Sequence, residues 1–163
     1  VDGDLRLGGH SHAVTGTAWL DREWSTSALE PGQRGWDWFA LQLEDGTDLM
    51  FYRLRREGGA TDPRSAGVVV GPDGASTALG AGSVELEPLR WWSSPKGGRY
   101  PVAWRMRLPQ RGLELSIEPV LSDQELDLSV RYWEGAVDVS GLRKRRKIKG
   151  RGYVELTGYG RGD

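Results

Sequence analysis

The chain has 163 residues, of which 22 are basic and 23 acidic, and a net charge of −1. This length suits one domain with a core of its own, and the balanced charge argues against a general binder of polyanions. Cysteine is absent, which excludes disulfides, thiolate nucleophiles and cysteine-based metal sites. The 24 glycines and 8 prolines exclude a helical bundle or coiled coil, because both residues break helices.

No stretch approaches the roughly 18 apolar residues that a membrane-spanning helix needs. Residues 1–4 lack the basic and apolar regions of a signal peptide. The sequence begins with Val1 instead of methionine, so we expect a processed or trimmed piece of a longer product.

Apolar and polar residues alternate along most of the chain, which is the pattern of half-buried strands. In chain order, the predicted strands cover residues 14–20, 36–43, 48–55, 66–71, 83–92, 100–108, 113–118, 126–130, 132–139 and 152–159. Asp45 and Gly46 predict a tight hairpin turn, and Pro88 predicts an edge strand or a bulge. These strands predict one antiparallel barrel or sandwich with less than about 10% helix. We find no linker, composition break or internal repeat, so we expect a single domain.

Four segments built around aromatic residues follow one another: residues 16–24 (GTAWLDREW), 35–39 (GWDWF), 132–135 (YWEG) and 150–159 (GRGYVELTGY). In residue type and order they resemble the carotenoid 1,2-hydratase-like, or hydroxyneurosporene synthase-like, family, which includes secreted hydrolase-like proteins and lipocalin-like Diels–Alderases. The resemblance implies an all-β, lipocalin-like (calycin-type) up-and-down barrel of about 8–10 antiparallel strands.

Members of that family usually carry two such halves. The resemblance implies that residues 1–163 form a single lipocalin-like domain, the C-terminal half of a two-domain protein. Its partner would be an N-terminal lipocalin-like half in the same or a separate chain. The resemblance also implies a hydrophobic small molecule as ligand and a periplasmic or other extracytoplasmic location.

Asp21 and Glu23 share one face of the predicted strand end, beside Trp24. Two carboxylates next to an indole can raise the pKa of one of them and produce a general acid; the alternative is a polar strand end paired with Arg22. Asp21 and Trp24 match a hydratase motif that resembles Asp-His-x-Trp. Arg22 replaces the histidine, and a permanent cation in place of a titrating imidazole argues against true carotenoid hydration.

Trp36 and Trp38 alternate around Asp37, so we expect both indoles on the concave face of the barrel, as core or as a ligand shelf. We expect Asp37 to face the opposite way, at the surface or between strands. On the last two strands, Tyr132 shares a face with Glu134, and Tyr153 shares a face with Glu155.

If these last two strands pair, the two acid–phenol sets converge, either for acid–base work or as a structural network that closes the barrel. Candidate catalytic residues are therefore Asp21, Glu23, Glu134 and Glu155, with Asp21 as first choice. Candidate ligand-binding residues are Trp24, Trp36, Trp38, Tyr132, Trp133 and Tyr159.

His10 and His12 have strand spacing but no third ligand follows them, so we predict no metal and no other cofactor. The basic run 143–149 contains no aromatic residue; we interpret it as a solvated hairpin loop and predict no nucleic-acid partner, with a membrane surface as the alternative. Nucleotide, nicotinamide, serine-elbow and HExxH motifs are absent from the sequence.

Three functions remain open. The first is an enzyme that uses carboxylates to hydrate, isomerise or cyclise an extended apolar ligand of isoprenoid, polyene or polyketide type. The second is a non-catalytic extracytoplasmic carrier that works beside a transporter. The third is the scaffold half of a two-domain protein. A pocket with a buried protonated carboxylate favours the first function, a pocket without one favours the second, and a filled barrel favours the third.

Overall fold

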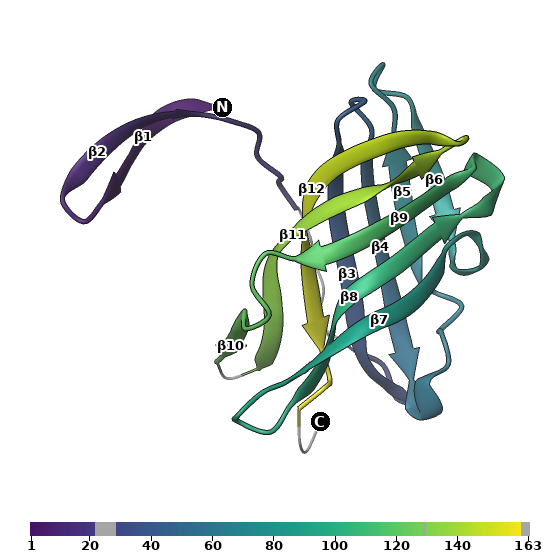
Figure 1. The fold of residues 1–163 in the computed structure, drawn as a ribbon. Coiled ribbons are helices and arrows are strands. Elements are labelled where there is room, and N and C mark those ends of the chain that lie inside the picture. The colour runs from purple at the N-terminus through teal and green to yellow at the C-terminus, as the bar shows by residue number, and fades with distance from the viewer. Residues whose placement is uncertain (22–28, 129, 161–163) are drawn as a thin grey trace.

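A ten-stranded antiparallel sheet curls on itself into an open barrel (Figure 1). The computed structural model describes residues 1–21, 29–128 and 130–160. The sheet comprises β3 (Gln33–Leu43), β4 (Asp48–Arg56), β5 (Ala66–Val70), β6 (Ser76–Gly80), β7 (Glu85–Ser93), β8 (Arg99–Leu108), β9 (Leu113–Pro119), β10 (Glu125–Asp127), β11 (Arg131–Arg143) and β12 (Arg146–Thr157). The only helical elements among the described residues are three 3₁₀ turns, Glu57–Gly59, Ala81–Ser83 and Pro109–Arg111. The all-β, lipocalin-like prediction is confirmed.

The strand order is β6-β5-β4-β3-β12-β11-β9-β8-β7, and β10 pairs with β11 at the side. Strands that follow one another in the chain are therefore mostly neighbours in the sheet. The pairing of β12 with β3 joins the last strand of this sheet in the chain to the first. Strands β6 and β7 are the two edges of the sheet. The register of β7 on β8 shifts at Pro88, as expected for an edge strand that contains proline.

The sequence predicts a tight hairpin turn at Asp45 and Gly46 and a solvated hairpin loop in the basic run 143–149. The Gly46 N–H donates to the Leu43 carbonyl at 3.0 Å, and Gly46 has a φ of +81°, which confirms the predicted tight turn. The basic run is not the loop that we expected, because β11 extends to Arg143 and β12 begins at Arg146. Only Lys144 and Arg145 lie between them, both with positive φ, as in a two-residue hairpin turn that continues the twist of its strands.

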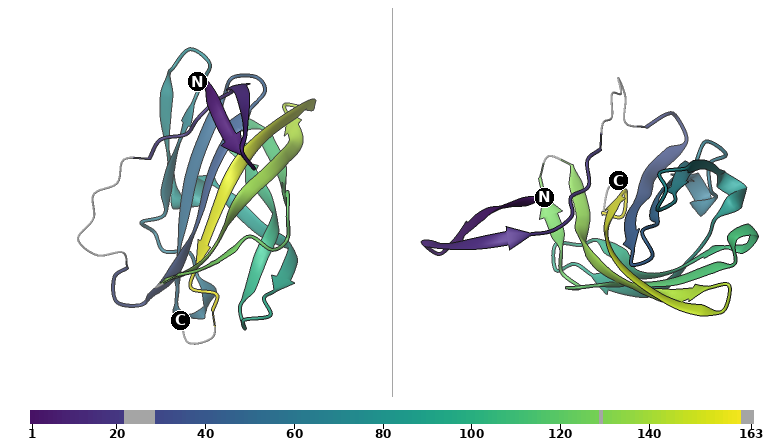
Figure 2. Two further views of the ribbon diagram at one scale, coloured as in Figure 1. Left: turned by 90° about the vertical axis from the view of Figure 1, so that its left-hand side faces the viewer. Right: turned by 90° about the horizontal axis from the view of Figure 1, so that it is seen from above.

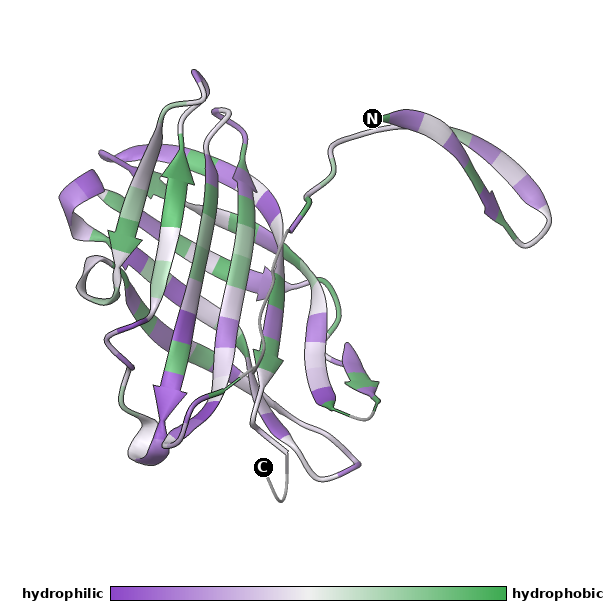
Figure 3. Ribbon diagram, turned by 180° about the vertical axis from the view of Figure 1, so that it is seen from behind, coloured by the Kyte–Doolittle hydropathy of each residue, from purple (hydrophilic) through white to green (hydrophobic). Residues whose placement is uncertain are grey.

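Side chains of the concave face fill the barrel. Hydrophobic and hydrophilic residues alternate along the strands (Figure 3), and the inward rows form one cluster of buried residues. Phe39, Trp104, Ile117 and Trp133, from four different strands, have no accessible surface. A side chain with no accessible surface has no space for a water molecule against it, so the middle of the barrel is packed solid.

Contrary to the prediction, Trp36 and Trp38 do not lie on the concave face, and Asp37 does not face away from it. Asp37 shares strand parity with the buried Phe39 and Leu41, and it is itself fully buried. Trp36 and Trp38 therefore lie on the convex face, where both are half-buried. The expectation failed because bulk was used as the guide to the inner face, although the aliphatic row that follows in the same strand sets it.

Two strands at the N-terminus form a separate sheet that the sequence analysis did not predict. β1 (Asp2–Leu7) and β2 (His10–Thr15) pair with each other alone. They project away from the barrel in Figure 1 and in the right-hand view of Figure 2. The predicted strand 14–20 is wrong beyond Thr15, since residues 16–21 are not strand. Strand β6 was also missed.

No helix in the described parts of the chain is long and apolar enough to cross a membrane.

Candidate functional site

Most of the described candidate residues gather on the convex face of β3, β11 and β12. In the sheet register Glu134 lies directly opposite Glu155, and Glu155 lies directly opposite Trp38. Directly opposite residues of antiparallel strands point to the same side of the sheet. We call this group the convex cluster; its members are Trp36, Trp38, Tyr132, Glu134, Tyr153 and Glu155.

Hydrogen bonds hold both carboxylates of the convex cluster. The Trp36 Nε1–H donates to Glu155 Oε1 at 2.6 Å, and the Tyr153 phenol is hydrogen-bonded to Glu134. The Trp36 and Tyr132 rings meet edge to face, with centroids 6.3 Å apart. Each carboxylate therefore has an aromatic donor beside it.

The pKa values of both tyrosines in the convex cluster are raised. Burial, followed by the charges of Glu155 and Glu134, raises the pKa of Tyr132. Burial, followed by the charge of Glu134 and its hydrogen bond, raises the pKa of Tyr153. Both phenols therefore stay protonated at neutral pH and act as hydrogen-bond donors.

Asp21 lies at the margin of the convex cluster. The Trp19 Nε1–H donates to Asp21 Oδ1 at 3.2 Å, and the Trp19 ring packs edge-on against Trp38 at 6.4 Å. The Thr17 hydroxyl donates to Gln42 Oε1 at 2.8 Å, so residues 16–21 run along the convex side of β3. Glu23 and Trp24, the other members of this motif, lie outside the described residues.

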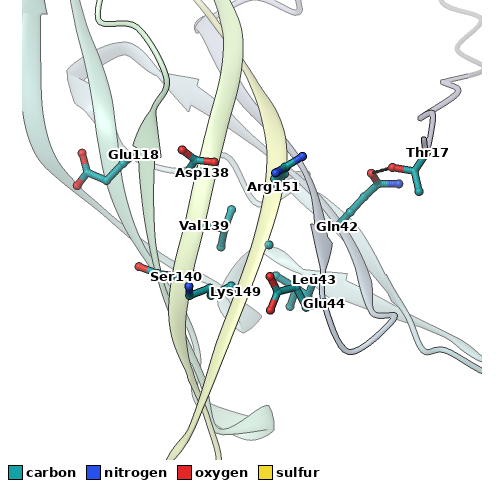
Figure 4. A pocket seen from close by; sticks show the side chains of 11 residues that line it. Thr17, Gln42, Leu43, Glu44, Glu118, Asp138, Val139, Ser140, Lys149 and Arg151 are labelled. Atoms are coloured by element: carbon teal, nitrogen blue, oxygen red, sulfur yellow. Dashed lines mark hydrogen bonds between the residues drawn. The ribbon is translucent and has the colours of Figure 1, made fainter. Parts of the chain in front are cut away.

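A polar groove of about 610 Å³ lies on the same convex face (Figure 4). Its charged lining includes Glu118, Asp138, Lys149 and Arg151 from β9, β11 and β12. Arg151 precedes Tyr153 of the convex cluster by two residues on the same strand face. The groove and the cluster are therefore neighbours along β12.

Trp133 and Tyr159 are not part of the cluster, because both point into the barrel. Trp133 is fully buried, and its Nε1–H donates to the Ser122 carbonyl at 2.8 Å. The Tyr159 hydroxyl donates to Asp37 Oδ1 at 2.7 Å.

Asp37 is the centre of a buried ion cluster that sequence reasoning missed. Arg53 Nε donates to Asp37 Oδ2 at 2.7 Å, and Arg55 Nε lies 3.3 Å from Asp37 Oδ1. Arg55 also donates to the Thr157 carbonyl, and its guanidinium lies 3.8 Å from the centre of the Tyr159 ring. Burial and the charge of Asp37 raise the pKa of Tyr159 above its ordinary range. The alternation of Arg53 and Arg55 in β4 could have suggested inward cations, since β3 places Asp37 on the same face.

The histidine pair is on the N-terminal sheet. His10 and His12 are on one face of it. Among the described residues no group of three or more histidine, cysteine, aspartate or glutamate side chains is arranged to hold a metal ion.

The fold and its convex cluster define a lipocalin-like barrel domain that carries paired carboxylates on its outer face. A model of the AttH-like family matches residues 1–159, and the chain belongs to this family. It is similar to the crystal structure of an AttH protein from Nitrosomonas europaea, with 37% identity and a TM-score of 0.85 over 98% of this chain and 49% of the other. It shares its fold with kievitone hydratase from Nectria haematococca, with 22% identity and a TM-score of 0.77 over 96% of this chain and 49% of the other. The chain thus spans about half the length of these two relatives. No curated protein matches it.

Proposed function

We propose that this domain contributes acid–base catalysis to the addition of water to an extended, apolar, unsaturated ligand, or to the reverse reaction. The observation that carries the proposal is the direct opposition of Glu134 and Glu155 beside Trp36, Tyr132 and Tyr153. Two carboxyl groups can share the two tasks of such a reaction, which are to give a proton and to accept one. The fold that this chain shares with a hydratase supports the same class of chemistry.

The reaction balances with these groups alone. One carboxylic acid gives its proton to an alkene carbon, the π electrons form the new C–H bond, and positive charge develops on the neighbouring carbon. A water oxygen attacks that carbon, and the second carboxylate takes the proton that the water releases. The indole faces stabilise the developing positive charge, and Tyr132 and Tyr153 donate hydrogen bonds.

The ligand is expected on the convex face, because the packed middle of the barrel leaves no water-sized space there. Trp36 and Trp38 provide a flat apolar surface for it, and Tyr153 connects this surface to the polar groove. A ligand that is apolar along most of its length would lie on the tryptophan surface, with a polar end in the groove.

The test uses retinol, a polyene with one hydroxyl group, as the probe for binding. Binding is measured as fluorescence energy transfer from the tryptophans to the bound retinol. Catalysis is followed by mass spectrometry in ¹⁸O-labelled water, with a panel of polyene alcohols and prenylated phenols. We expect Glu134→Gln and Glu155→Gln each to keep retinol binding and to lower the rate of label incorporation about a hundredfold or more. The matched control is Glu85→Gln, an exposed carboxylate on the edge strand β7.

Each outcome decides between the functions. Unchanged turnover in both amide variants would refute the acid–base role of the convex cluster. Retinol binding without label incorporation for any compound of the panel would favour the carrier. The filled barrel supports the scaffold half as a second candidate, and no binding at all would favour it.

A further inference from the structure

The end of the β11–β12 hairpin carries an exposed run of positive charge, which we call the basic tip. Its members are Lys144, Arg145, Arg146, Lys147 and Lys149, and all five are exposed. Within the part of the chain that the structure describes, none of these five side chains forms an ion pair. The hairpin ends at the end of the barrel opposite the C-terminus (Figures 1 and 2).

The carboxylates next to the basic tip do not neutralise it. Arg143 lies 3.2 Å from an Asp45 carboxylate oxygen, so this carboxylate on the β3–β4 turn is already paired. The Glu44 N–H donates to the Lys149 carbonyl at 2.9 Å, but the side chains of these two residues form no ion pair. The charge of the basic tip is therefore available to a partner in solution.

The turn of this hairpin is built from residues that its backbone disfavours. Lys144 has a φ of +46° and Arg145 a φ of +70°. A two-residue hairpin turn with two positive φ angles forms most easily from Asn-Gly or Asp-Gly, because a larger side chain strains the left-handed conformation. Two long basic side chains at these positions cost stability that another sequence would avoid. Such a cost at an exposed turn indicates a function for the side chains.

An exposed apolar side chain lies among the cations. Leu142 is 45% exposed and lies directly opposite Lys147 in the register, on the same face of the hairpin. A cluster of about four to eight cations matches the anionic headgroups of a bilayer, and an apolar side chain beside them matches the region beneath the headgroups. Single-stranded nucleic acid would require aromatic side chains for base stacking, and residues 142–149 contain none.

We infer that the basic tip docks on the surface of a bilayer that contains anionic phospholipids. The lipid phosphates pair with the cations, and Leu142 enters the interface between them. The positive charge continues along the convex face of β12, because Lys147, Lys149 and Arg151 occupy alternate positions of the strand.

Docking of the basic tip would bring the polar groove next to the bilayer. Lys149 belongs to the basic tip and also lines the groove, together with Arg151 (Figure 4). An apolar molecule that leaves the bilayer would therefore meet the groove first. The inference itself stands on the charge and shape of the hairpin and does not depend on the proposed function.

The experiment measures cosedimentation of the chain with vesicles of phosphatidylcholine, either pure or with about one third phosphatidylglycerol. We expect binding to the anionic vesicles only. Joint replacement of Lys144, Arg146 and Lys147 by glutamine should lower the apparent affinity at least about tenfold, because each cation near an anionic surface adds to binding. At about 1 M NaCl the screening length is only about 3 Å, so the parent chain should leave the vesicles.

The matched control removes the same charge from the other end of the barrel. It replaces the exposed residues Arg34, Lys96 and Arg99, at the start of β3 and around the start of β8, by glutamine. This variant should bind the anionic vesicles with at least the affinity that its lower net charge allows, within about threefold of the parent chain.

Three results would overturn the inference: no binding of the parent chain to anionic vesicles, an equal loss in the two triple variants, or binding that persists at high salt. Binding to a DNA duplex without binding to the vesicles would assign the basic tip to a nucleic acid instead. If the triple variant of the tip does not fold, Lys147→Glu replaces it, because this single exposed change reverses one charge of the tip and should weaken vesicle binding in the same way.

Discussion

At the scale of single residues, the buried carboxylate of Asp37 organises the inside of the barrel at one end. It neutralises Arg53 and accepts hydrogen bonds from Arg53 and Tyr159, while Arg55 contacts its other oxygen. A buried cation without its counter-charge is strongly destabilising, so the aspartate is needed mainly because the arginines are there.

We therefore expect Asp37→Asn to lower the free energy of unfolding by about 3 kcal/mol or more. The measurement is urea denaturation at neutral pH. The control is Asp138→Asn, an exposed carboxylate on β11, which should stay within about 0.5 kcal/mol of the parent protein. Equal stability of the two variants would show that the ion cluster is not structural.

Asp62 is a buried carboxylate with a lowered pKa, so we expect it to make the stability of the fold depend on pH in acid. The backbone N–H of Arg64 donates to this carboxylate, and together with the Gln33 amide and the charges of Arg56 and Arg64 it lowers the pKa of Asp62 to about 2, against the opposing effect of burial. The unfolded chain has an ordinary pKa of 3.8 at this position. A carboxyl group with a lower pKa in the folded state stabilises the fold above the unfolded pKa and loses this contribution as the pH falls.

We expect the parent protein to lose stability as the pH falls from about 4 to about 2. The Asp62→Asn variant should lose less stability over the same range, because it has no carboxylate to protonate at this position. The measurement is the urea midpoint at a series of pH values across this window. An identical pH dependence of the parent and the variant would contradict the assignment.

At the scale of the elements, glycines allow β12 to approach β3 closely. A Cβ at Gly152 would lie 2.4 Å from the Ala40 carbonyl oxygen, whereas a Cβ at Gly80 would meet nothing within 4 Å. We expect Gly152→Ala to cost about 1–3 kcal/mol of stability, because the backbone would have to move. Gly80→Ala is the control and should be nearly neutral. Thermal unfolding of the two variants tests this, and a neutral Gly152→Ala would mean that the strand can shift without cost.

In the tip of the β11–β12 hairpin, one basic residue is bound to the neighbouring turn and the others are exposed. Arg143 donates to the Thr47 hydroxyl at 3.0 Å and lies 3.2 Å from an Asp45 carboxylate oxygen, which ties the tip to the β3–β4 turn. The basic residues from 144 to 147 are exposed. Replacement of Lys144, Arg146 and Lys147 by glutamine should change stability by no more than about 0.5 kcal/mol and leave retinol binding unchanged. Loss of retinol binding in this variant would contradict the separation of the tip from the ligand site.

At the scale of the whole molecule, the chain has two levels of stability. The barrel has a continuous core, whereas the N-terminal sheet buries no residue. In the chain alone we expect the amides of β8 and β9 to exchange only through global unfolding and those of β1 and β2 through local opening. Hydrogen exchange followed by mass spectrometry tests this. Comparable protection of the N-terminal sheet and of β8 would refute the separation.

Much of the fold follows from local patterns in the sequence. The alternation in β8, the Asp45-Gly46 turn and the shift at Pro88 were all predicted, because period-2 burial, turn geometry and the missing N–H of proline act over a few residues. The pairing of the last two strands was also anticipated as a condition for the convergence of Glu134 with Glu155, and the register places these residues opposite each other.

The sequence by itself determined the all-β class, the strand alternation and the type of residue available for acid–base chemistry. The tertiary structure decided which partners meet inside the barrel around Asp37. Asp37 is buried because Arg53, Arg55 and Tyr159 meet it from β4 and from the end of the chain, and no local pattern records that meeting. For the same reason Trp36 and Trp38 lie outside, on the face that carries the convex cluster. A one-residue shift in strand parity exchanges the two faces, so a wrong choice of the inner residue misplaces every side chain of the motif.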